Sequence, residues 1–306
     1  MNRTLALAVL LAVALLPEAG RAELRIVTTT TDLGYFARAI GGDRVHVDTI
    51  CQGPQDPHFV QARPSYMVTV SRADLLIAVG LDLEVGWLPS LVQGARNPDV
   101  NPGHRGYLET STAITPIDVP HGAVDRSRGD IHPHGNPHYW LDPQNAKLVA
   151  RTIATRMSEL DPENAATFRS NLASWTARAD RAIDRWSKAM APHRGTKIAS
   201  YHATFNYFHA RFGLTAIGYL EERPGIPPAP AHLVDLIRQM RAARVPVIFH
   251  ETYYDQATSQ MVASRTGAQL LLLPTAVGGV AGVTSYEKLI DHIVDQFVRA
   301  MGRARQ

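Results

Sequence analysis

The sequence predicts an α/β protein of two lobes with mostly parallel sheets flanked by helices, joined by one long linking helix. Three observations predict this fold class. Short β-branched segments alternate with longer segments of helical periodicity in both halves of the chain, which is typical of βαβ units. Between the halves, no proline or glycine occurs from residue 163 to residue 191. The chain has 306 residues, 45% of them hydrophobic, which is enough for two domains.

Each half contains its own set of expected elements. The expected strands of the first half are Leu24–Thr29, Val45–Ile50 and Leu75–Val79. Asp32 can cap a helix that continues to about Ile40, and Pro64 can open a second helix that ends near Arg72. The expected strands of the second half are Lys197–Ser200, Thr215–Tyr219, Val247–His250 and Gln269–Leu273. The helices expected between them are Phe205–Phe212, Pro230–Arg244 and Asp255–Thr266.

The segment between the halves begins with Asp161–Pro162, a cap followed by a proline in the first turn. Its apolar residues recur every three or four positions: Phe168, Leu172, Trp175, Ala179, Ile183, Trp186 and Met190. This spacing predicts a helix of about eight turns, either a stiff strut between two lobes or a core helix of one lobe. We therefore expect an N-terminal lobe over residues 23–161, a linking helix over 162–190 and a C-terminal lobe over 191–306.

Residues 1–22 have the layout of a secretory signal peptide. Arg3 precedes an apolar run over residues 5–16, which is shorter than the roughly 20 residues of a membrane span, and small residues follow. We expect cleavage before Glu23 and a location in the periplasm. Because no cysteine lies near the expected cleavage site, we do not expect a lipoprotein.

Charge, cysteine content and missing motifs exclude several classes. The net charge of +3 comes from 31 basic and 28 acidic residues without a basic cluster, which argues against nucleic-acid or lipid-surface binding. Cys51 is the only cysteine, so no internal disulfide can form, and we expect a buried small residue rather than a ligand. The absence of GxSxG, GxxxxGK and GxGxxG gives hydrolase, P-loop and dinucleotide sites no support.

Histidines gather in DIHPHGNPHYWLDP (Asp130–Pro143), but HExxH and CxxC are absent. Three histidines lie in similar topological places. His58 and His202 each follow an expected strand, and His138 lies in the NPHYWLDP turn before an expected helix. Ligands of open α/β sheets gather at the carboxyl ends of strands, so these three imidazoles can converge on a metal. Each of them, taken alone, can equally be a structural histidine.

Several segments, in order along the chain, resemble the cluster A-I metal-binding solute-binding proteins of ABC importers for zinc and manganese. They are GPQDPHFVQARPS (Gly53–Ser65), GLDLEVGWL (Gly80–Leu88), NPHYWLDP (Asn136–Pro143), SYHATFNYFHARFGL (Ser200–Leu214) and IFHETYYD (Ile248–Asp255). The resemblance implies two α/β lobes joined by one long helix and a single metal in the cleft between them. It also implies a receptor rather than an enzyme.

The resemblance makes His58, His138 and His202 metal ligands. A histidine at the third position is typical of zinc-type members, whereas manganese-type members usually have glutamate there. Zn(II) is therefore the expected cargo, with Mn(II) as the alternative. The HPHG stretch resembles a short form of the histidine-rich loop of zinc-type members, which implies an auxiliary metal-collecting role for the loop histidines: His121, His132 and His134.

The fourth ligand departs from the family pattern. Members often supply an aspartate from the loop after a late strand, but this loop reads LPTAVGGVAG, with Ala276 or Val277 near that position. Either Glu251, at the end of an expected strand, or a water molecule takes its place. Glu251 can equally be a hydrogen-bonded structural acid, and Glu221 and Glu222 are further candidates.

These observations predict a monomeric periplasmic receptor that captures Zn(II) and passes it to an inner-membrane ABC permease with its ATPase. Because imidazole binds metal only when neutral, affinity should fall as the pH drops below about 6.5. One alternative is a manganese or iron receptor of the same family. Two others are a metal buffer without a permease and a zinc-dependent hydrolase with Glu251 as general base.

Overall fold

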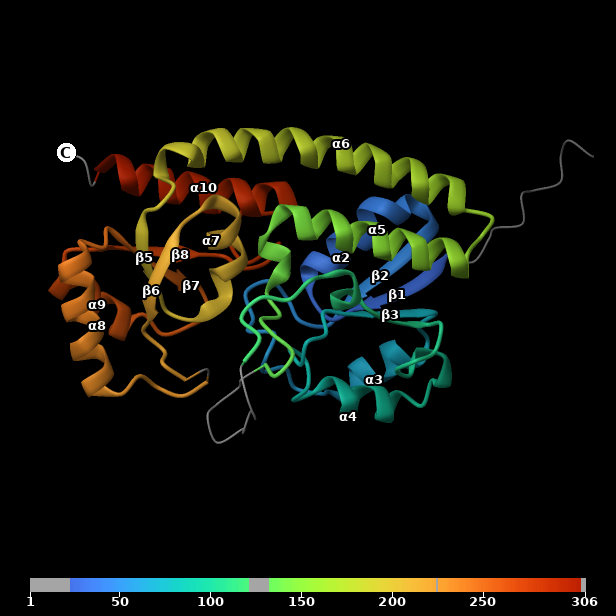
Figure 1. The fold of residues 1–306 in the computed structure, drawn as a ribbon. Helices are drawn as coiled ribbons and strands as arrows, with labels where there is room; N and C mark the ends of the chain where they lie inside the picture. Colours follow the sequence, from blue (N-terminus) through green and yellow to red (C-terminus); the bar gives the residue numbers. More distant parts are fainter. Residues whose placement is uncertain (1–22, 121–131, 224, 304–306) are drawn as a thin grey trace, which may run out of the picture.

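Two parallel four-stranded sheets with the same strand order form the frame of the protein (Figure 1). The computed structural model describes residues 23–120, 132–223 and 225–303. The first sheet has the order β2-β1-β3-β4, and its strands are β1 (Leu24–Thr28), β2 (Val45–Thr49), β3 (Leu75–Ala78) and β4 (Tyr107–Glu109). The second has the order β6-β5-β7-β8, with β5 (Lys197–Ser200), β6 (Thr215–Tyr219), β7 (Val247–Glu251) and β8 (Gln269–Leu273). The predicted α/β fold class is confirmed.

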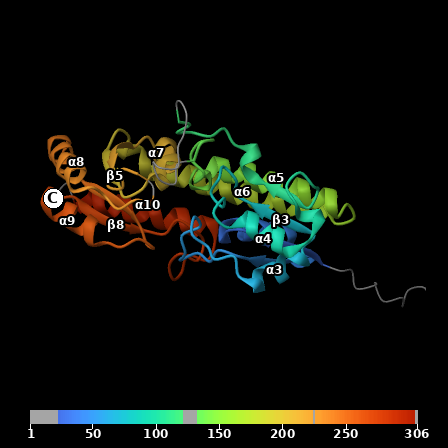
Figure 2. The same ribbon diagram turned by 90° about the horizontal axis from the view of Figure 1, so that it is seen from below.

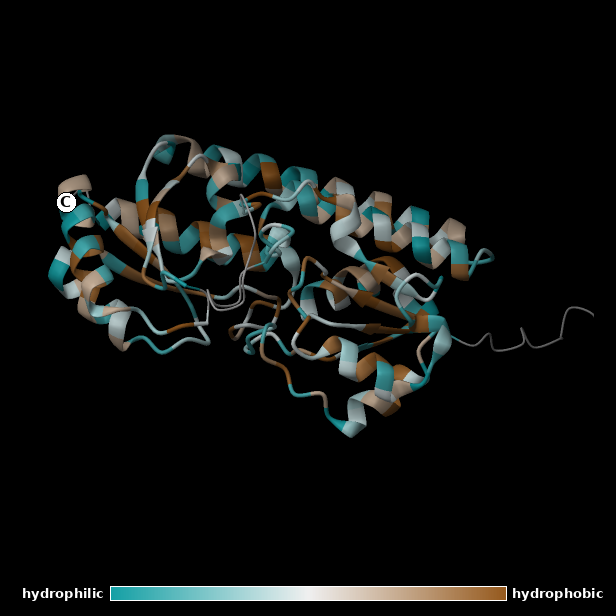
Figure 3. Cartoon of the chain, turned by 60° about the horizontal axis from the view of Figure 1, so that its bottom comes forward, coloured by the Kyte–Doolittle hydropathy of each residue, from teal (hydrophilic) through white to brown (hydrophobic). Residues whose placement is uncertain are grey.

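Helices cover both faces of each sheet, and the two lobes lie side by side (Figures 1 and 2). The helices of the first half are α2 (Thr31–Gly41), α3 (Pro64–Ser71), α4 (Leu88–Ala95) and α5 (Pro143–Leu160). The second half contains α7 (Asn206–Phe212), α8 (Pro230–Ala243), α9 (Ala257–Thr266) and α10 (Tyr286–Arg303). Three elements were not foreseen from the sequence: β4, α4 and α10. Strands and inward helix faces carry the hydrophobic residues, as Figure 3 shows.

The long helix α6 (Ala165–Met190) runs across both lobes (Figure 1). It begins three residues after Pro162. Asp161 is the C-cap of α5, and the carboxylate of Asp161 accepts a hydrogen bond from Asn164 Nδ2 (2.6 Å) in the turn between the two helices. The predicted stripe is buried except for Leu172, which is half-buried. The helix packs against α2 and α5 of the first half and against α10 of the second. It is therefore both a strut and a core helix of a continuous apolar core.

Asp32 does not cap α2 as the sequence predicted. The N-cap is Thr30, and Asp32 lies inside the first turn, where it is buried. Its Oδ1 accepts a hydrogen bond from the backbone N–H of Val277 (3.1 Å), in the loop after β8. Burial raises the pKa of Asp32 to about 7. The carboxyl group thus joins the two halves of the molecule instead of serving the helix end.

The NPHYWLDP segment also joins the two halves. Trp140 Nε1 donates to the carbonyl of Thr275 (2.7 Å), and Tyr286 of α10 donates to the carbonyl of Trp140 (2.6 Å). Asp142 caps α5 through the N–H of Gln144 and also accepts two hydrogen bonds from Arg211 of α7 (2.6 and 2.7 Å). This paired geometry fixes one lobe against the other next to His138. Within the described residues, no helix is long and apolar enough to cross a membrane.

Candidate metal centre

Three loops bring His58, His138 and His202 together where the two halves meet. His58 lies in the loop after β2, His138 immediately before the 3₁₀ turn Tyr139–Leu141, and His202 two residues after β5. One ring nitrogen from each of them lies within 4.8 Å of the corresponding atoms of the others, and all three side chains are buried. In the described ranges, no other group of three or more histidine, cysteine or acidic side chains is arranged to hold a metal ion.

Two of the imidazoles are held by the same local motif, an acidic or amide residue followed by proline and histidine. In Asp56-Pro57-His58, Asp56 Oδ1 accepts from both the backbone N–H (3.0 Å) and Nδ1 (2.7 Å) of His58. In the corresponding tripeptide, Asn136 Oδ1 accepts from the backbone N–H (3.0 Å) and pairs with Nδ1 (2.9 Å) of His138. This is a side-chain turn that orients the ring of the histidine two residues later.

The orientation of the Asn136 amide fixes the tautomer of His138. Asn136 Nδ2 donates to Asp118 (3.1 Å) and to the carbonyl of Ala203 (2.8 Å), so its oxygen faces the ring. His138 must then carry its proton on Nδ1. Its Nε2 is buried, has no hydrogen-bond partner, and presents its lone pair to the cluster.

His202 is held by a residue distant in sequence. Its Nδ1 donates to Glu221 Oε2 (2.7 Å), and the other oxygen of Glu221 accepts from the backbone N–H of Gly225 (3.0 Å). Glu221, one of the candidate ligands from the sequence, therefore occupies the outer side of the ring. All three rings turn Nδ1 outward to an acceptor and Nε2 inward, as metal-binding histidines do.

Burial and neighbouring groups shift the pKa values of His138 and Asp56 in this site. Burial, together with the neighbouring His58 and His202, holds the pKa of His138 well below its usual range. Burial opposes ionisation of Asp56, but the hydrogen bonds and charge of His58 outweigh it and keep the pKa of Asp56 below its ordinary value. The site can thus offer lone pairs to a cation at neutral pH without first losing a proton from His138.

The loop histidines differ in position. His132 lies next to the cluster, with its Nε2 3.2 Å from Nε2 of His58. Burial, and then the neighbouring His58 and His202, lower the pKa of His132 to about 3. His134 is exposed, and His121 lies outside the described residues.

Glu251 does not belong to the group of converging ligand atoms. It ends β7 and is fully buried. Burial raises its pKa to about 8. Glu222 is exposed. Cys51 is buried outside the group, and burial raises the pKa of its thiol to about 12, as expected for an inert small residue.

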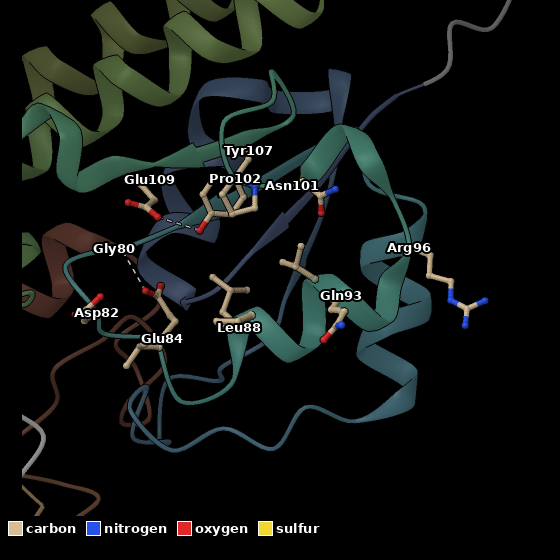
Figure 4. Close-up of a pocket in the computed structure, with 13 residues that line it drawn as sticks. Gly80, Asp82, Glu84, Leu88, Gln93, Arg96, Asn101, Pro102, Tyr107 and Glu109 are labelled. Atoms are coloured by element: carbon tan, nitrogen blue, oxygen red, sulfur yellow. Dashed lines mark hydrogen bonds between the residues drawn. The ribbon is translucent and has the colours of Figure 1, made fainter. Parts of the chain in front are cut away.

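A separate cavity of about 570 Å³ lies in the first half, between α4 and β4 (Figure 4). Leu88 and Tyr107 are among its lining residues, and Glu84 and Glu109 add carboxylates to its wall. No histidine lines it, so it is distinct from the metal centre.

Two lobes, a bridging helix and three converging imidazoles define the class of a two-lobed metal receptor. The family model of the periplasmic component A of zinc-uptake complexes matches residues 26–300. The chain therefore belongs to this family, the metal-binding substrate-binding proteins of ABC importers. It is an extracytoplasmic receptor and not an enzyme, and it serves an ABC permease with its ATPase. The hydrolase alternative is thus wrong.

Known relatives and structures agree with this assignment. The chain is 26% identical over 255 residues to the metal ABC transporter substrate-binding lipoprotein ScbA of Streptococcus cristatus, covering 81% of this chain and 78% of that protein. It is 25% identical over 292 residues to the manganese ABC transporter substrate-binding lipoprotein PsaA of Streptococcus pneumoniae TIGR4, covering 92% and 90%.

Among solved structures, the crystal structure of ZnuA has a TM-score of 0.75 at 24% identity, covering 91% of this chain and 99% of that chain. The cadmium-bound periplasmic metal binding protein of Candidatus Liberibacter asiaticus has a TM-score of 0.76 at 21% identity, covering 91% and 100%. These likenesses show the shared fold.

Proposed function

We propose that this chain is a monomeric periplasmic receptor that captures Zn(II) between its lobes on His58, His138 and His202. The observation that carries the proposal is the convergence of one ring nitrogen from each of three imidazoles, with every Nδ1 hydrogen-bonded to an oxygen acceptor, which leaves Nε2 for the metal. Imidazole is a preferred ligand of Zn(II), whereas Mn(II) favours oxygen donors. The group contains no carboxylate, which supports zinc over the manganese named for the streptococcal relative.

The experiment that tests this function is a calorimetric titration of the metal-free protein with Zn(II) and, separately, Mn(II). We expect one tight zinc site and much weaker manganese binding. His138→Ala should abolish the tight site, while the exposed His104→Ala serves as a matched control. Stronger binding of Mn(II), or unchanged zinc binding in the His138 variant, would contradict the proposal.

We also propose the domain limits expected from the sequence: residues 1–22 as a signal peptide, 23–161 and 191–306 as lobes, and 162–190 as the linking segment, of which 165–190 form the helix α6. Support comes from the bonds between the halves, among them those of Asp142 with Arg211 and of Trp140 with Thr275. With so many fixed contacts, the lobes should move little on loading. Small-angle scattering of the zinc-free and zinc-loaded protein should give nearly equal radii of gyration, and a large change would contradict this.

A further inference from the structure

We propose that His132 is the fourth ligand of the same metal site, so that the shell consists of four imidazoles. This inference rests on the proposed function, because it deepens the zinc site formed by His58, His138 and His202. It replaces both fourth ligands expected from the sequence, Glu251 and water, and it changes His132 from an auxiliary loop residue into a residue that determines metal specificity.

The spacing of the ring nitrogens supports a shared metal. His132 Nε2 lies 3.2 Å from Nε2 of His58. Two nitrogens bound to one tetrahedral Zn(II) at about 2.0–2.1 Å are separated by about 3.3–3.4 Å. The ring of His132 is centred 5.3 Å from that of His58 and 6.2 Å from that of His138. The rings of His58, His138 and His202 are centred 5.2 to 5.8 Å from one another, so His132 adjoins the cluster on the side of His58 and lies just outside the group whose ligand atoms are all within 4.8 Å.

The Nε2 atoms of His58 and His132 face each other at hydrogen-bond distance. Asp56 accepts from Nδ1 of His58, which leaves Nε2 of His58 without a proton when the ring is neutral. Two lone pairs at this distance repel each other, so either a proton on one nitrogen or a metal ion between them must offset the repulsion. A metal ion held by His58, His138 and His202 would do so. The backbone of Leu81 lies beside the ring of His132.

The backbone that meets His132 is held in an unusual conformation. Leu81 and Asp82 have φ values of 53° and 63°, a left-handed region that side chains other than glycine rarely adopt. Glu84 holds the preceding residues by accepting hydrogen bonds from the N–H groups of Val79 (2.7 Å) and Gly80 (3.0 Å), and Figure 4 shows its carboxylate directed at Gly80. Such strain persists only where the surroundings impose it, and it gathers at ligand sites.

His132 itself is anchored by a turn. The N–H of Gly135 donates to the carbonyl of His132 (3.2 Å), and the N–H of Asn136 donates to the carbonyl of Ile117 (2.8 Å). Gly135 has a φ of 105°, and a Cβ there would lie 2.8 Å from the Ile117 carbonyl oxygen. Only glycine fits this position, so the turn that presents His132 to the cluster is specified by the sequence.

A fourth imidazole has a direct consequence for the choice of metal. A carboxylate in that position would offer the oxygen donor that suits Mn(II), whereas nitrogen favours Zn(II). We therefore expect His132→Ala to weaken zinc binding by at least about tenfold, more than it weakens manganese binding. His132→Asp should improve Mn(II) binding relative to Zn(II).

The test compares wild type, His132→Ala, His132→Asp, Glu251→Gln and the exposed control His104→Ala. Zn(II) and Mn(II) affinities are measured by competition with chelators, and the visible absorption of the Co(II)-loaded proteins reports the ligand field. Circular dichroism verifies that each variant is folded. We expect a tetrahedral Co(II) spectrum that changes in both His132 variants and is retained in the other two.

The outcomes separate the two proposals. If His132→Ala keeps the wild-type spectrum and zinc affinity, the fourth-ligand proposal is overturned while the zinc receptor stands. A spectral change in Glu251→Gln with none in His132→Ala would assign the fourth position to Glu251 and overturn it as well. If the wild type itself binds no zinc in a 1:1 ratio, the proposed function has failed before His132 is tested.

Discussion

The two halves of the molecule share a strand order but hold their histidines in different ways. In the first half, His58 and His138 are oriented by Asp56 and Asn136, each only two residues away. In the second half, His202 depends on Glu221, nineteen residues away and just beyond the end of β6. The first arrangement is encoded in a tripeptide, whereas the second exists only once the sheet has formed. The two rings of the first half should therefore be preorganised more locally than His202.

The largest effect is expected when the second half loses its ligand. In the proposed site His202 is the ligand contributed by the second half, so His202→Ala should remove the attachment of the metal to that lobe. Zinc affinity should fall by more than the roughly 10–100-fold that follows loss of an outer hydrogen-bond partner. Chelator competition measures this. A fall no larger than that of Glu221→Ala would contradict the ligand role.

The next effect concerns the long-range partner. Glu221→Ala should reduce zinc affinity by about 10–100-fold, because the ring of His202 loses the acceptor that fixes its orientation. Glu221→Gln retains an oxygen that can accept from Nδ1 and should recover most of the loss. Equal affinities for the two variants would show that Glu221 does not orient His202.

A smaller effect is expected when one local motif is converted into the other. Asp56→Asn turns the DPH tripeptide into the NPH form that already holds His138, so both hydrogen bonds of the turn can be retained. We expect a loss of only a few-fold in zinc affinity, against about 10–100-fold for Asp56→Ala. Isothermal titration of both variants tests this. A loss in Asp56→Asn as large as in Asp56→Ala would mean that the charge of Asp56, and not the turn, is what matters.

The smallest effect on metal binding is expected at Asp32, which joins the halves away from the histidines. Its pKa is about 7 in the folded protein against 3.8 for an unburied group, because burial disfavours the charged form. The unfolded state releases the proton first, so the free energy of unfolding should fall as the pH rises from about 4 to about 7.

Asp32→Asn removes this ionisation and keeps an oxygen for the N–H of Val277. Relative to wild type, the metal-free variant should gain stability across that pH range, by up to a few kcal/mol, at about 1.4 kcal/mol per pKa unit. Denaturant unfolding at pH 4.5 and 7.5 measures the difference. A constant difference between the two proteins would contradict the shifted pKa.

The elements that could be predicted from the sequence are those in which apolar residues recur at a regular spacing over a long enough segment. The strands with buried β-branched residues and the stripe of α6 follow from spacing alone. β4 has only three residues, too few to show a period. In the final helix α10, the buried residues Leu289, Ile293 and Phe297 recur every four positions, and this apolar spacing is sufficient to predict a helix.

The convergence of three histidines could be predicted from the sequence, whereas the groups that orient them could not. Strand-end positions suggested that His58, His138 and His202 could converge, but sequence cannot tell a ligand from the residue that orients it. Glu221 could be assigned to the outer side of His202 only when the path of the chain beyond β6 was known. His132 lies only six residues before His138, and spacing alone could not show that its ring turns back toward His58.

The central claim is that histidines from both halves bind one metal. X-ray absorption at the zinc edge of the wild-type protein loaded with one equivalent of Zn(II) tests it most directly. We expect four-coordinate zinc with nitrogen at about 2.0–2.1 Å and outer-shell scattering from at least three imidazoles. A six-coordinate, oxygen-rich shell, or fewer than three imidazoles, would contradict it.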